Sequence, residues 1–287
     1  MKLLGRYLSM GLLLALMLAG MSLPSPATRA DDHRNDGRSK VVVNTPPGSP
    51  TRKESRTLAE RKLGEELDRS VLTTLYQSTG GDHWKNQANW LNNRVHHCDG
   101  WYGVTCTGDD VRRVVMLNLP ANQLCGELPP ELGNLSRLRV MNLAANQLSE
   151  GIPPELGHLS RLQYLSLAAN PLTGPIPPDL GRLSQLEYLN LAGDQLSGNI
   201  PPELGNLSNL RTLYLFANPL SGEIPPELGD LTQLQYLYLF ADQLNSDVPP
   251  ELNHLSNLQI LHLNQNQLTH LPDLENLVHL QYLYPVS

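Results

Sequence analysis

The chain has 287 residues, of which 40% are hydrophobic and 17% are charged, and its formal net charge at pH 7 is −7. So many apolar residues can form a sizeable buried core, which excludes a chain that is disordered throughout. The acidic balance argues against nucleic acid and anionic membrane surfaces as partners, because both carry negative charge.

The first thirty residues have the composition of a secretory signal peptide. A basic start is followed by an apolar run from Met10 to Met21, which is too short to span a bilayer comfortably. Small residues come next, with Ala27 or Ala30 as the expected cleavage point. We therefore predict that residues 1–30 are removed and that the mature protein is secreted or extracytoplasmic, without a membrane span.

Two further segments precede the repeats. Residues 31–57 are polar and rich in proline, serine and arginine, so we predict a disordered linker. Residues 58–110 are predicted to form an N-terminal helical cap. Leucines recur there at helical spacing from Leu58 to Leu75, and Gly80 and Gly81 end the helix.

Residues 111–287 repeat themselves with a period of 24 residues, in seven repeats and a partial one. Leucine or a similar residue stands eight, five and three positions before an asparagine-like residue and two positions after it. The asparagine-like positions are Asn122, Asn146, Asn170, Asp194, Asn218, Asp242 and Asn266. This regular period predicts a solenoid, in which each coil buries its leucines against its neighbours.

The letters of one repeat predict its local structure. The motif LxxLxL is typical of a short strand whose leucines point into the stack while the residues between them point outward. Asparagine side chains both donate and accept hydrogen bonds, so a ladder of them can bond the turning backbone of adjacent repeats. The segment IPPELG predicts a helical turn with proline at its start and an acid near its positive end. One carboxylate per repeat does not provide the roughly six clustered oxygens that calcium prefers, so we expect no cation site there.

The stretch NPLSGEIPPELGDLTQLQYLYL resembles the plant-type leucine-rich repeat, whose hallmark is LxGxIP after the asparagine turn. The segment from Leu75 to Cys106 resembles the N-terminal cap of the same proteins, with its tryptophans and its WxGVxC ending. The resemblance implies an α/β fold, namely a curved, horseshoe-shaped solenoid with a parallel concave sheet, short helical or 3-10 turns on the convex side, and a helical cap. It also implies binding, because the family includes receptor ectodomains, wall-associated recognition proteins and inhibitors of cell-wall hydrolases such as polygalacturonase. Similar repeats occur in bacteria.

The cap contains two cysteines. Cys98 and Cys106 match the pair in the family's cap, and the resemblance implies that they form a disulfide in an exported protein. A metal site is the alternative, because His96 and His97 lie beside Cys98. We expect no metal, since a structural zinc site prefers paired short spacings. Cys125 is left over as a free thiol, at a position where other repeats have serine.

Three departures from the family's pattern are expected to affect the fold. Glu150 displaces a glycine by one residue and Ser246 replaces one, so we expect the second sheet of the plant type to be irregular there. The repeat after Asn266 shortens to 22 residues, and no cysteine cap follows it. The leucines of the last strand then lack cover, which predicts that this end frays or self-associates.

No catalytic motif stands out. The sequence lacks GxSxG, HExxH and a phosphate-binding glycine loop, so we predict a protein that is not an enzyme and has no cofactor. Two acids, Asp194 and Asp242, stand in the asparagine ladder, where an ionised aspartate accepts hydrogen bonds but cannot donate them. Local tolerance and a pH-sensitive role are both open for these acids, since burial raises the pKa of a carboxyl group.

The outward positions of the strands contain every tyrosine and phenylalanine of the repeats. Strands about 5 Å apart would place Tyr214, Phe216, Tyr238 and Phe240 in one block on the concave face. The predicted ligand-binding residues are Tyr188, Tyr214, Phe216, Tyr236, Tyr238, Phe240 and His262. Exposed, rigid aromatic rings provide contact area at low entropic cost, which favours binding over the alternative of cross-strand stacking alone.

Together these features predict a secreted, non-enzymatic recognition protein that binds a protein or peptide through its aromatic concave face. The alternatives are a glycan-binding protein, an inhibitor of cell-wall hydrolases, and a structural surface protein that self-associates. Asn134 and Asn206 begin sequons that are also part of the repeat consensus, so their glycosylation stays open.

Overall fold

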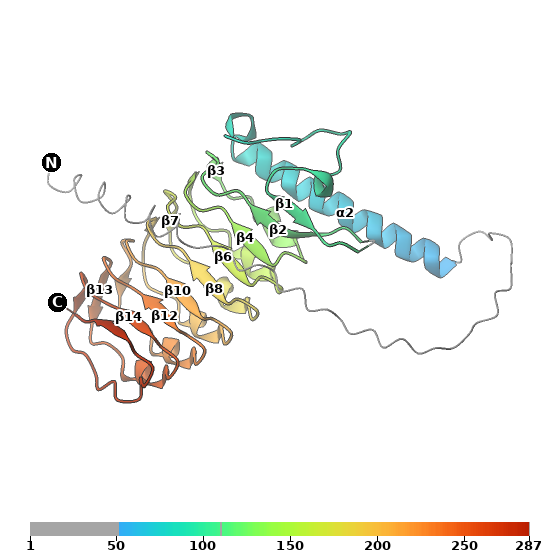
Figure 1. The fold of residues 1–287 in the computed structure, drawn as a ribbon. Coiled ribbons are helices and arrows are strands. Elements are labelled where there is room, and N and C mark those ends of the chain that lie inside the picture. The colour runs from blue at the N-terminus through green and yellow to red at the C-terminus, as the bar shows by residue number, and fades with distance from the viewer. Residues whose placement is uncertain (1–51, 110, 287) are drawn as a thin grey trace, which may run out of the picture. The chain divides into compact units, whose positions relative to one another are not determined.

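The computed structural model describes residues 52–109 and 111–286. The predicted signal peptide and most of the predicted linker lie outside the described residues. The chain divides into residues 1–61 and residues 62–287, and the second unit contains the repeats and most of the cap (Figure 1). No helix in the described part of the chain is both long enough and apolar enough to cross a membrane.

The cap is built on helix α2 (Arg52–Ser78), which begins before residue 58, where we predicted the cap to start. Gly80 follows the helix with a φ of 65°, a left-handed conformation that glycine adopts without strain. The ring centres of Tyr76 and Trp84 are 5.1 Å apart, and those of Trp84 and Trp90 are 4.7 Å apart. The other elements of the cap are η1 (Gly81–His83), η2 (His97–Asp99) and β1 (Val104–Cys106).

A buried ion pair fastens the cap to the first repeat. The carboxylate of Asp68, which is 1% exposed, accepts hydrogen bonds from Arg113 Nε at 2.9 Å and Nη2 at 2.7 Å. It also accepts one from the backbone N–H of Val114 at 2.8 Å. Because the buried charge is paired and fully hydrogen-bonded, its burial is tolerated, and the helix is held against the first strand of the solenoid.

The repeats place their LxxLxL segments in one nine-stranded sheet, with the order β1-β2-β4-β6-β8-β10-β12-β14-β16. Strand β1 is antiparallel to β2, and the other neighbours are parallel and in register at the repeat period, as in the pairing of Leu213 with Leu237. The repeat strands are β2 (Val114–Asn118), β4 (Val140–Asn142), β6 (Tyr164–Ser166), β8 (Tyr188–Asn190), β10 (Thr212–Tyr214), β12 (Tyr236–Tyr238), β14 (Ile260–His262) and β16 (Tyr282–Tyr284). The predicted parallel sheet is confirmed.

The IPPELG segments form the predicted short turns on the other side of each coil. They are the 3-10 helices η3 (Pro130–Asn134), η4 (Pro154–His158), η5 (Pro178–Arg182), η6 (Pro202–Asn206), η7 (Pro226–Asp230) and η8 (Pro250–His254). A Cβ on Gly229 would overlap the backbone carbonyl of Glu251 in the next turn, so only glycine allows the turns to stack this closely. Asn253 replaces this glycine in η8, where no further turn of this kind follows, and its Oδ1 instead accepts from Asn276 N at 2.9 Å.

A second set of short strands runs along the flank of the solenoid. These strands are β3 (Cys125–Glu127), β5 (Gln147–Ser149), β7 (Thr173–Gly174), β9 (Gln195–Leu196), β11 (Ser221–Gly222), β13 (Gln243–Ser246) and β15 (Gln267–Leu268). They pair as β3-β5, β7-β9 and β11-β13-β15, so the flank sheet is interrupted after β5, next to Glu150, as predicted. It is interrupted again after β9, which was not predicted, and among the described residues only the isolated bridge between Gly198 and Leu220 lies there. At Ser246 the prediction of irregularity is wrong: β13 pairs with strands on both sides although Ser246 has a φ of 73°.

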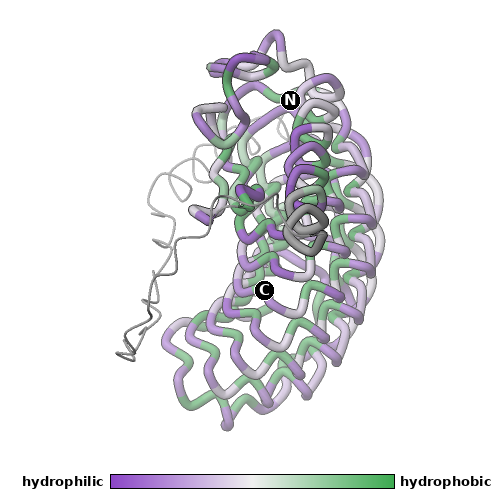
Figure 2. Tube along the Cα trace, turned by 90° about the vertical axis from the view of Figure 1, so that its right-hand side faces the viewer, coloured by the Kyte–Doolittle hydropathy of each residue, from purple (hydrophilic) through white to green (hydrophobic). Residues whose placement is uncertain are grey.

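The core is a column of leucines closed on one side by the predicted asparagine ladder. The inward leucines of successive strands, such as Leu165, Leu189 and Leu213, are fully buried. Asn146 Oδ1 accepts from the N–H of Asn122 at 2.9 Å and of Leu124 at 3.1 Å, both in the preceding repeat. Along the repeats, hydrophobic and hydrophilic segments alternate within each coil (Figure 2). The stacked coils follow an arc (Figure 2).

Candidate ligand-binding surface

The aromatic side chains of the strand face gather at its C-terminal half. We call the seven predicted residues, together with Tyr164, the aromatic patch. They lie on or next to β6, β8, β10, β12 and β14, and all of them except Tyr236 form a continuous series of ring contacts. The seven residues are Tyr188, Tyr214, Phe216, Tyr236, Tyr238, Phe240 and His262. The structure thus brings the predicted residues together on one face.

The two phenylalanines are not exposed, contrary to the prediction. Phe216 is 5% exposed and Phe240 9%, and their rings stack 4.4 Å apart with an angle of 10° between them. Strands spaced about 4.8 Å apart hold equivalent rings at stacking distance, so each ring covers the next. His262 covers the far side of Phe240 at 4.0 Å. The phenylalanines therefore form the packed floor of the patch rather than its contact surface.

Two tyrosines stand on this floor with hydroxyl groups that are free to bind. The rings of Tyr214 and Tyr238 meet edge to face, 4.7 Å apart, and both side chains are half-buried. Burial raises the pKa of both phenols, so both hydroxyls keep their protons at neutral pH. Neither hydroxyl has a hydrogen-bond partner among the described residues. A ligand that offers acceptor oxygens would supply the missing partners.

The polar groups of Tyr188, Tyr236 and His262 are already hydrogen-bonded within the protein. Tyr188 stacks on Tyr164 at 4.4 Å, and its hydroxyl accepts from Asn190 Nδ2 at 3.2 Å. The hydroxyl of Tyr236 donates to Gln259 Oε1 at 3.1 Å. His262 Nε2 lies 2.9 Å from the side-chain oxygen of Asn264, and burial lowers the pKa of the imidazole, so the ring is neutral at pH 7. These side chains frame Tyr214 and Tyr238 rather than offering free polar groups.

The other half of the strand face is small and polar. Asn142 donates from Nδ2 to Asn118 Oδ1 at 3.0 Å, and Ser166 is 1% exposed. Ala144 and Ala168 occupy the positions that correspond to the phenylalanines, and both are buried. The amides of Asn118 and Asn142 bond to each other, whereas the buried hydroxyl of Ser166 has no hydrogen-bond partner among the described residues.

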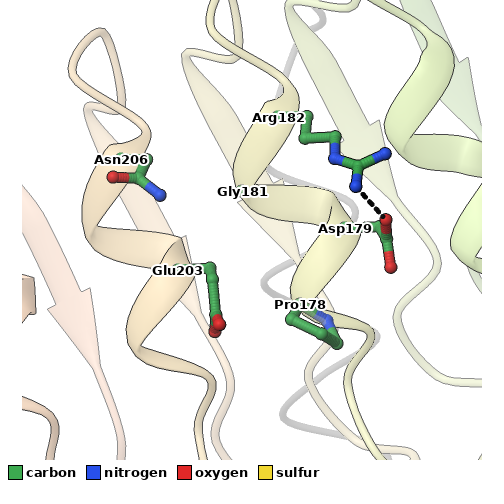
Figure 3. A pocket seen from close by; sticks show the side chains of 6 residues that line it. All are labelled: Pro178, Asp179, Gly181, Arg182, Glu203 and Asn206. Carbon is green, nitrogen blue, oxygen red and sulfur yellow. Dashed lines mark ion pairs between the residues drawn. The ribbon is translucent and has the colours of Figure 1, made fainter.

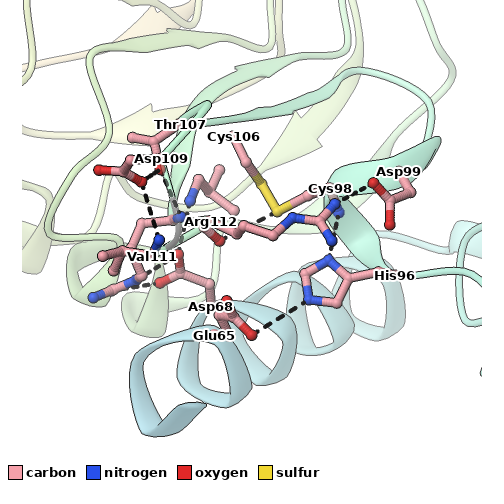
Figure 4. Close-up of a disulfide and its surroundings, with 12 residues drawn as sticks. Glu65, Asp68, His96, Cys98, Asp99, Cys106, Thr107, Asp109, Val111 and Arg112 are labelled. Atoms are coloured by element: carbon pink, nitrogen blue, oxygen red, sulfur yellow. Dashed lines mark hydrogen bonds and ion pairs between the residues drawn. A yellow bond between two sulfur atoms is a disulfide. The ribbon is translucent and has the colours of Figure 1, made fainter. Parts of the chain in front are cut away.

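The predicted disulfide of the cap is confirmed. Cys98 and Cys106 are joined, with their Cα atoms 5.4 Å apart (Figure 4). The ligand atoms of His96, His97 and Cys98 lie within 4.8 Å of one another, but the sulfur of Cys98 is committed to the disulfide. Two imidazoles remain, fewer than the four ligands of a structural zinc site. Cys125, at the start of β3, is exposed and unpaired, as predicted.

His97 lies in the cap without a polar partner. It is fully buried, stacks on His96 with ring centres 4.2 Å apart, and neither ring nitrogen has a hydrogen-bond partner among the described residues. Burial lowers its pKa to about 4, with a smaller contribution from the neighbouring His96, so the ring is neutral and acts as packing. His96 instead accepts from Cys98 N through Nδ1 and lies 3.7 Å from Glu65 (Figure 4).

A shallow pocket of about 320 Å³ lies on the 3-10 turns, away from the aromatic patch. It is lined by Pro178, Asp179, Gly181, Arg182, Glu203 and Asn206, from η5 and η6 (Figure 3). Arg182 Nη2 pairs with Asp179 Oδ1 at 3.1 Å on its rim. These groups are paired or open to solvent, so the pocket brings no reactive set of side chains together.

Comparisons with known proteins agree with the fold. A family model described as "Leucine-rich repeat region" matches residues 115–225. The chain is 32% identical to the Arabidopsis receptor kinase HAESA in complex with the peptide hormone IDA and the co-receptor SERK1, over 75% of this chain and 41% of that one, with a TM-score of 0.59. No curated protein matches the sequence.

Two further solved structures extend the comparison. The ectodomain of the Arabidopsis thaliana receptor kinase GASSHO1/SCHENGEN3, in complex with CASPARIAN STRIP INTEGRITY FACTOR 2, is 30% identical over 76% of this chain and 35% of that one, with a TM-score of 0.54. A plant ice-binding protein shares the fold at 24% identity, over 77% of this chain and 86% of that one, with a TM-score of 0.63. The chain thus spans about a third of the GASSHO1/SCHENGEN3 ectodomain. From the helical cap, the parallel sheet with its asparagine ladder, and these matches, the chain is a plant-type leucine-rich repeat protein.

Proposed function

We propose that the protein is a secreted, non-enzymatic recognition module that binds an extended peptide, or an extended segment of a protein, across the aromatic patch. The observation that carries this proposal is the pair of protonated, unpartnered hydroxyls of Tyr214 and Tyr238 above a packed aromatic floor. The similar receptor kinase HAESA was solved in complex with a peptide hormone, which supports the same class of ligand.

The chemistry of the patch favours a main chain as its ligand. The two hydroxyls belong to adjacent strands that pair in register, so both can donate to carbonyl oxygens on the same side of one extended segment. The tyrosine rings add rigid apolar contact area that loses little entropy on binding. Few charges lie beside the patch, and Arg211 and Glu187 at its margin face each other at 3.7 Å. A largely uncharged peptide therefore fits best.

Glycan binding, hydrolase inhibition and self-association are weaker alternatives. A sugar binds to the face of an aromatic ring, whereas the stacked faces of Phe216 and Phe240 are covered by their neighbours. Self-association finds support in Val278, Tyr282 and Leu283, which are exposed near β16. Light scattering over a range of protein concentrations separates that alternative from a monomeric recognition module.

Selection of ligands from a display library of random linear peptides tests the proposal. The immobilised wild-type chain is compared with the double variant Tyr214→Phe/Tyr238→Phe, which keeps both rings and removes both hydroxyls. Tyr236→Phe is the matched control, because it removes a hydroxyl that already has a partner in the protein. We expect peptides that bind the wild type and the control but not the double variant. Equal recovery on all three chains, or no enrichment at all, would contradict the proposal.

Secretion is tested separately by the mass of the mature chain. Cleavage after Ala27 or Ala30 would give Thr28 or Asp31 as the first residue. Recovery of either species outside the cells that produce the protein supports the proposed localisation, and an intact Met1 in the cell extract would oppose it.

A further inference from the structure

The asparagine ladder uses each amide as both a donor and an acceptor. In the four rungs Asn146, Asn170, Asn218 and Asn266, Nδ2 donates to two leucine carbonyls, three and 27 residues earlier, at distances between 2.5 and 3.2 Å. Oδ1 of each rung accepts a backbone N–H from the preceding repeat. A working rung therefore needs one donor and one acceptor at the same place.

Two rungs are acids that use only half of this pattern. Asp194 Oδ1 accepts from Asn170 N at 2.7 Å, and Asp242 Oδ1 accepts from Asn218 N at 2.8 Å. The second oxygen of each carboxyl group is buried and has no hydrogen-bond partner among the described residues. Asp242 and Asn218 occupy equivalent positions of successive repeats, so Oδ2 of Asp242 corresponds to Nδ2 of Asn218, which donates.

The repeat also identifies what surrounds each unpartnered oxygen. For Asp194 the carbonyls three and 27 residues earlier are those of Leu191 and Leu167, and both already accept from neighbouring asparagines. For Asp242 they are those of Leu239 and Leu215. An ionised Oδ2 there would face carbonyl oxygens in a dry interior, whereas a protonated Oδ2 would restore the donor.

We propose that Asp194 and Asp242 are neutral, protonated rungs, and that loss of their protons loosens the turns that hold the floor of the aromatic patch. The turn of Asp194 is hydrogen-bonded to one phenylalanine of that floor, and the coil that carries Asp242 contains the other. Gly193 N, beside Asp194, donates to the carbonyl of Phe216 at 2.9 Å, and Phe240 stands two residues before Asp242. The rungs and the floor are thus parts of the same coils.

Among residues 52–109 and 111–286, no ionised side chain offsets this effect. The adjacent rungs Asn170, Asn218 and Asn266 are neutral. The titratable groups on the facing strands are Tyr188, Tyr214, Tyr236, Tyr238 and His262, with Glu187 and Arg211 paired at the margin. Burial is the main cause that raises the pKa of Asp242 to about 8 and the pKa of Asp194 well above its ordinary value, while the N–H of the preceding rung opposes it.

The sign of the pH dependence follows from these directions. The pKa in the folded chain is raised, so the folded state binds the proton more tightly than the unfolded state does. Stability is then highest below the unfolded value of about 3.8, falls as the unfolded chain ionises, and levels off once the folded chain ionises near pH 8. Asparagine at the same positions removes this loss, because an amide does not titrate.

Melting of the unliganded full chain between about pH 4 and pH 8 tests the rungs directly. The Tm of the wild type should fall between these pH values by roughly 5 °C more than the Tm of the double variant Asp194→Asn/Asp242→Asn. Asp230→Asn, which changes an exposed acid at the end of η7, should follow the wild type. The infrared carbonyl band of a protonated carboxyl group should be present in the wild type at about pH 6 and absent from the double variant. Parallel melting profiles, or no such band, would overturn the proposal.

The link to the aromatic patch rests on the proposed function and is tested with the selected peptides. Their affinity for the wild type should fall at least about threefold more between pH 6 and pH 9 than their affinity for Asp194→Asn/Asp242→Asn. Equal losses in both chains would overturn the link. The melting experiment uses no ligand, so a failure to select any peptide would contradict the proposed function and leave the evidence for the rungs intact.

Discussion

The two halves of the concave face are built on the same coil and present different surfaces. In both halves the inward leucines are fully buried and the strands pair in register at the repeat period. The outward positions of β2 and β4 contain no aromatic residue, whereas those of β10 and β12 contain the tyrosines above the phenylalanine floor. The leucine and asparagine frame therefore determines the solenoid, and the outward positions are free to vary.

The largest expected effect comes from removing the floor of the aromatic half. Phe216→Ala and Phe240→Ala should each cost about 3–5 kcal/mol of the free energy of unfolding, because a buried ring leaves a cavity. Urea denaturation measures the loss, with Phe216→Leu as the control that keeps most of the volume. A cost below about 1 kcal/mol for Phe216→Ala would show that the ring is not packed as a floor.

The shared frame predicts equal effects in both halves. Gly133→Ala and Gly229→Ala should each cost about 1–3 kcal/mol, because a Cβ at either position overlaps a backbone carbonyl of the next turn. Denaturation of both variants checks the equality. Asn253→Ala is the matched comparison at the corresponding position of η8, where a side chain is already accommodated. A much smaller cost in one half would mean that the turns stack differently there.

A left-handed residue on the flank gives a smaller, stabilising effect. Glu150 has a φ of 65°, and the flank sheet is interrupted beside it, so Glu150→Gly should raise the free energy of unfolding by about 1 kcal/mol. Ser246→Gly should do the same, although the flank sheet is continuous at Ser246. Thermal melting compares the two, and destabilisation by either change would show that its side chain makes a contact worth more than the strain.

The smallest effects on stability are expected within the aromatic half. Tyr236→Phe removes a hydrogen bond to Gln259 and should cost about 1 kcal/mol. Tyr214→Phe and Tyr238→Phe remove hydroxyls without partners and should change stability by less than about 0.5 kcal/mol. Denaturation curves measured side by side give the order. A loss of 1 kcal/mol or more for Tyr214→Phe would mean that its hydroxyl already serves the fold.

The sequence alone predicts the repeated frame well, because the frame is periodic. The leucines, the asparagine ladder and the 3-10 turns all follow from letters that recur every 24 residues, and the disulfide from the resemblance of Cys98 and Cys106 to a known cap. The aromatic cluster also follows from the sequence, because its residues recur at equivalent positions of successive repeats. These features depend on local sequence patterns that occur again in each repeat.

The burial of the patch could not be predicted from the same alternation. Phe216 lies two residues beyond the last residue of β10, where the strand turns toward Asn218 and neighbouring coils cover the side chain. Burial there depends on what the adjacent coil contributes, as the buried Ala168 at the corresponding position shows. The unpartnered oxygens of Asp194 and Asp242 depend in the same way on the carbonyls of neighbouring coils. The alternation of residues along one strand does not reveal these contacts with neighbouring coils.

The most direct test of the account is hydrogen–deuterium exchange of the chain with and without a peptide selected on it. Bound peptide should slow exchange in residues 212–216 and 236–240 and leave residues 116–119 and 140–144 unchanged. Slowing confined to the small, polar half, or to the 3-10 turns, would contradict the claim that the aromatic half of the concave face is the binding surface.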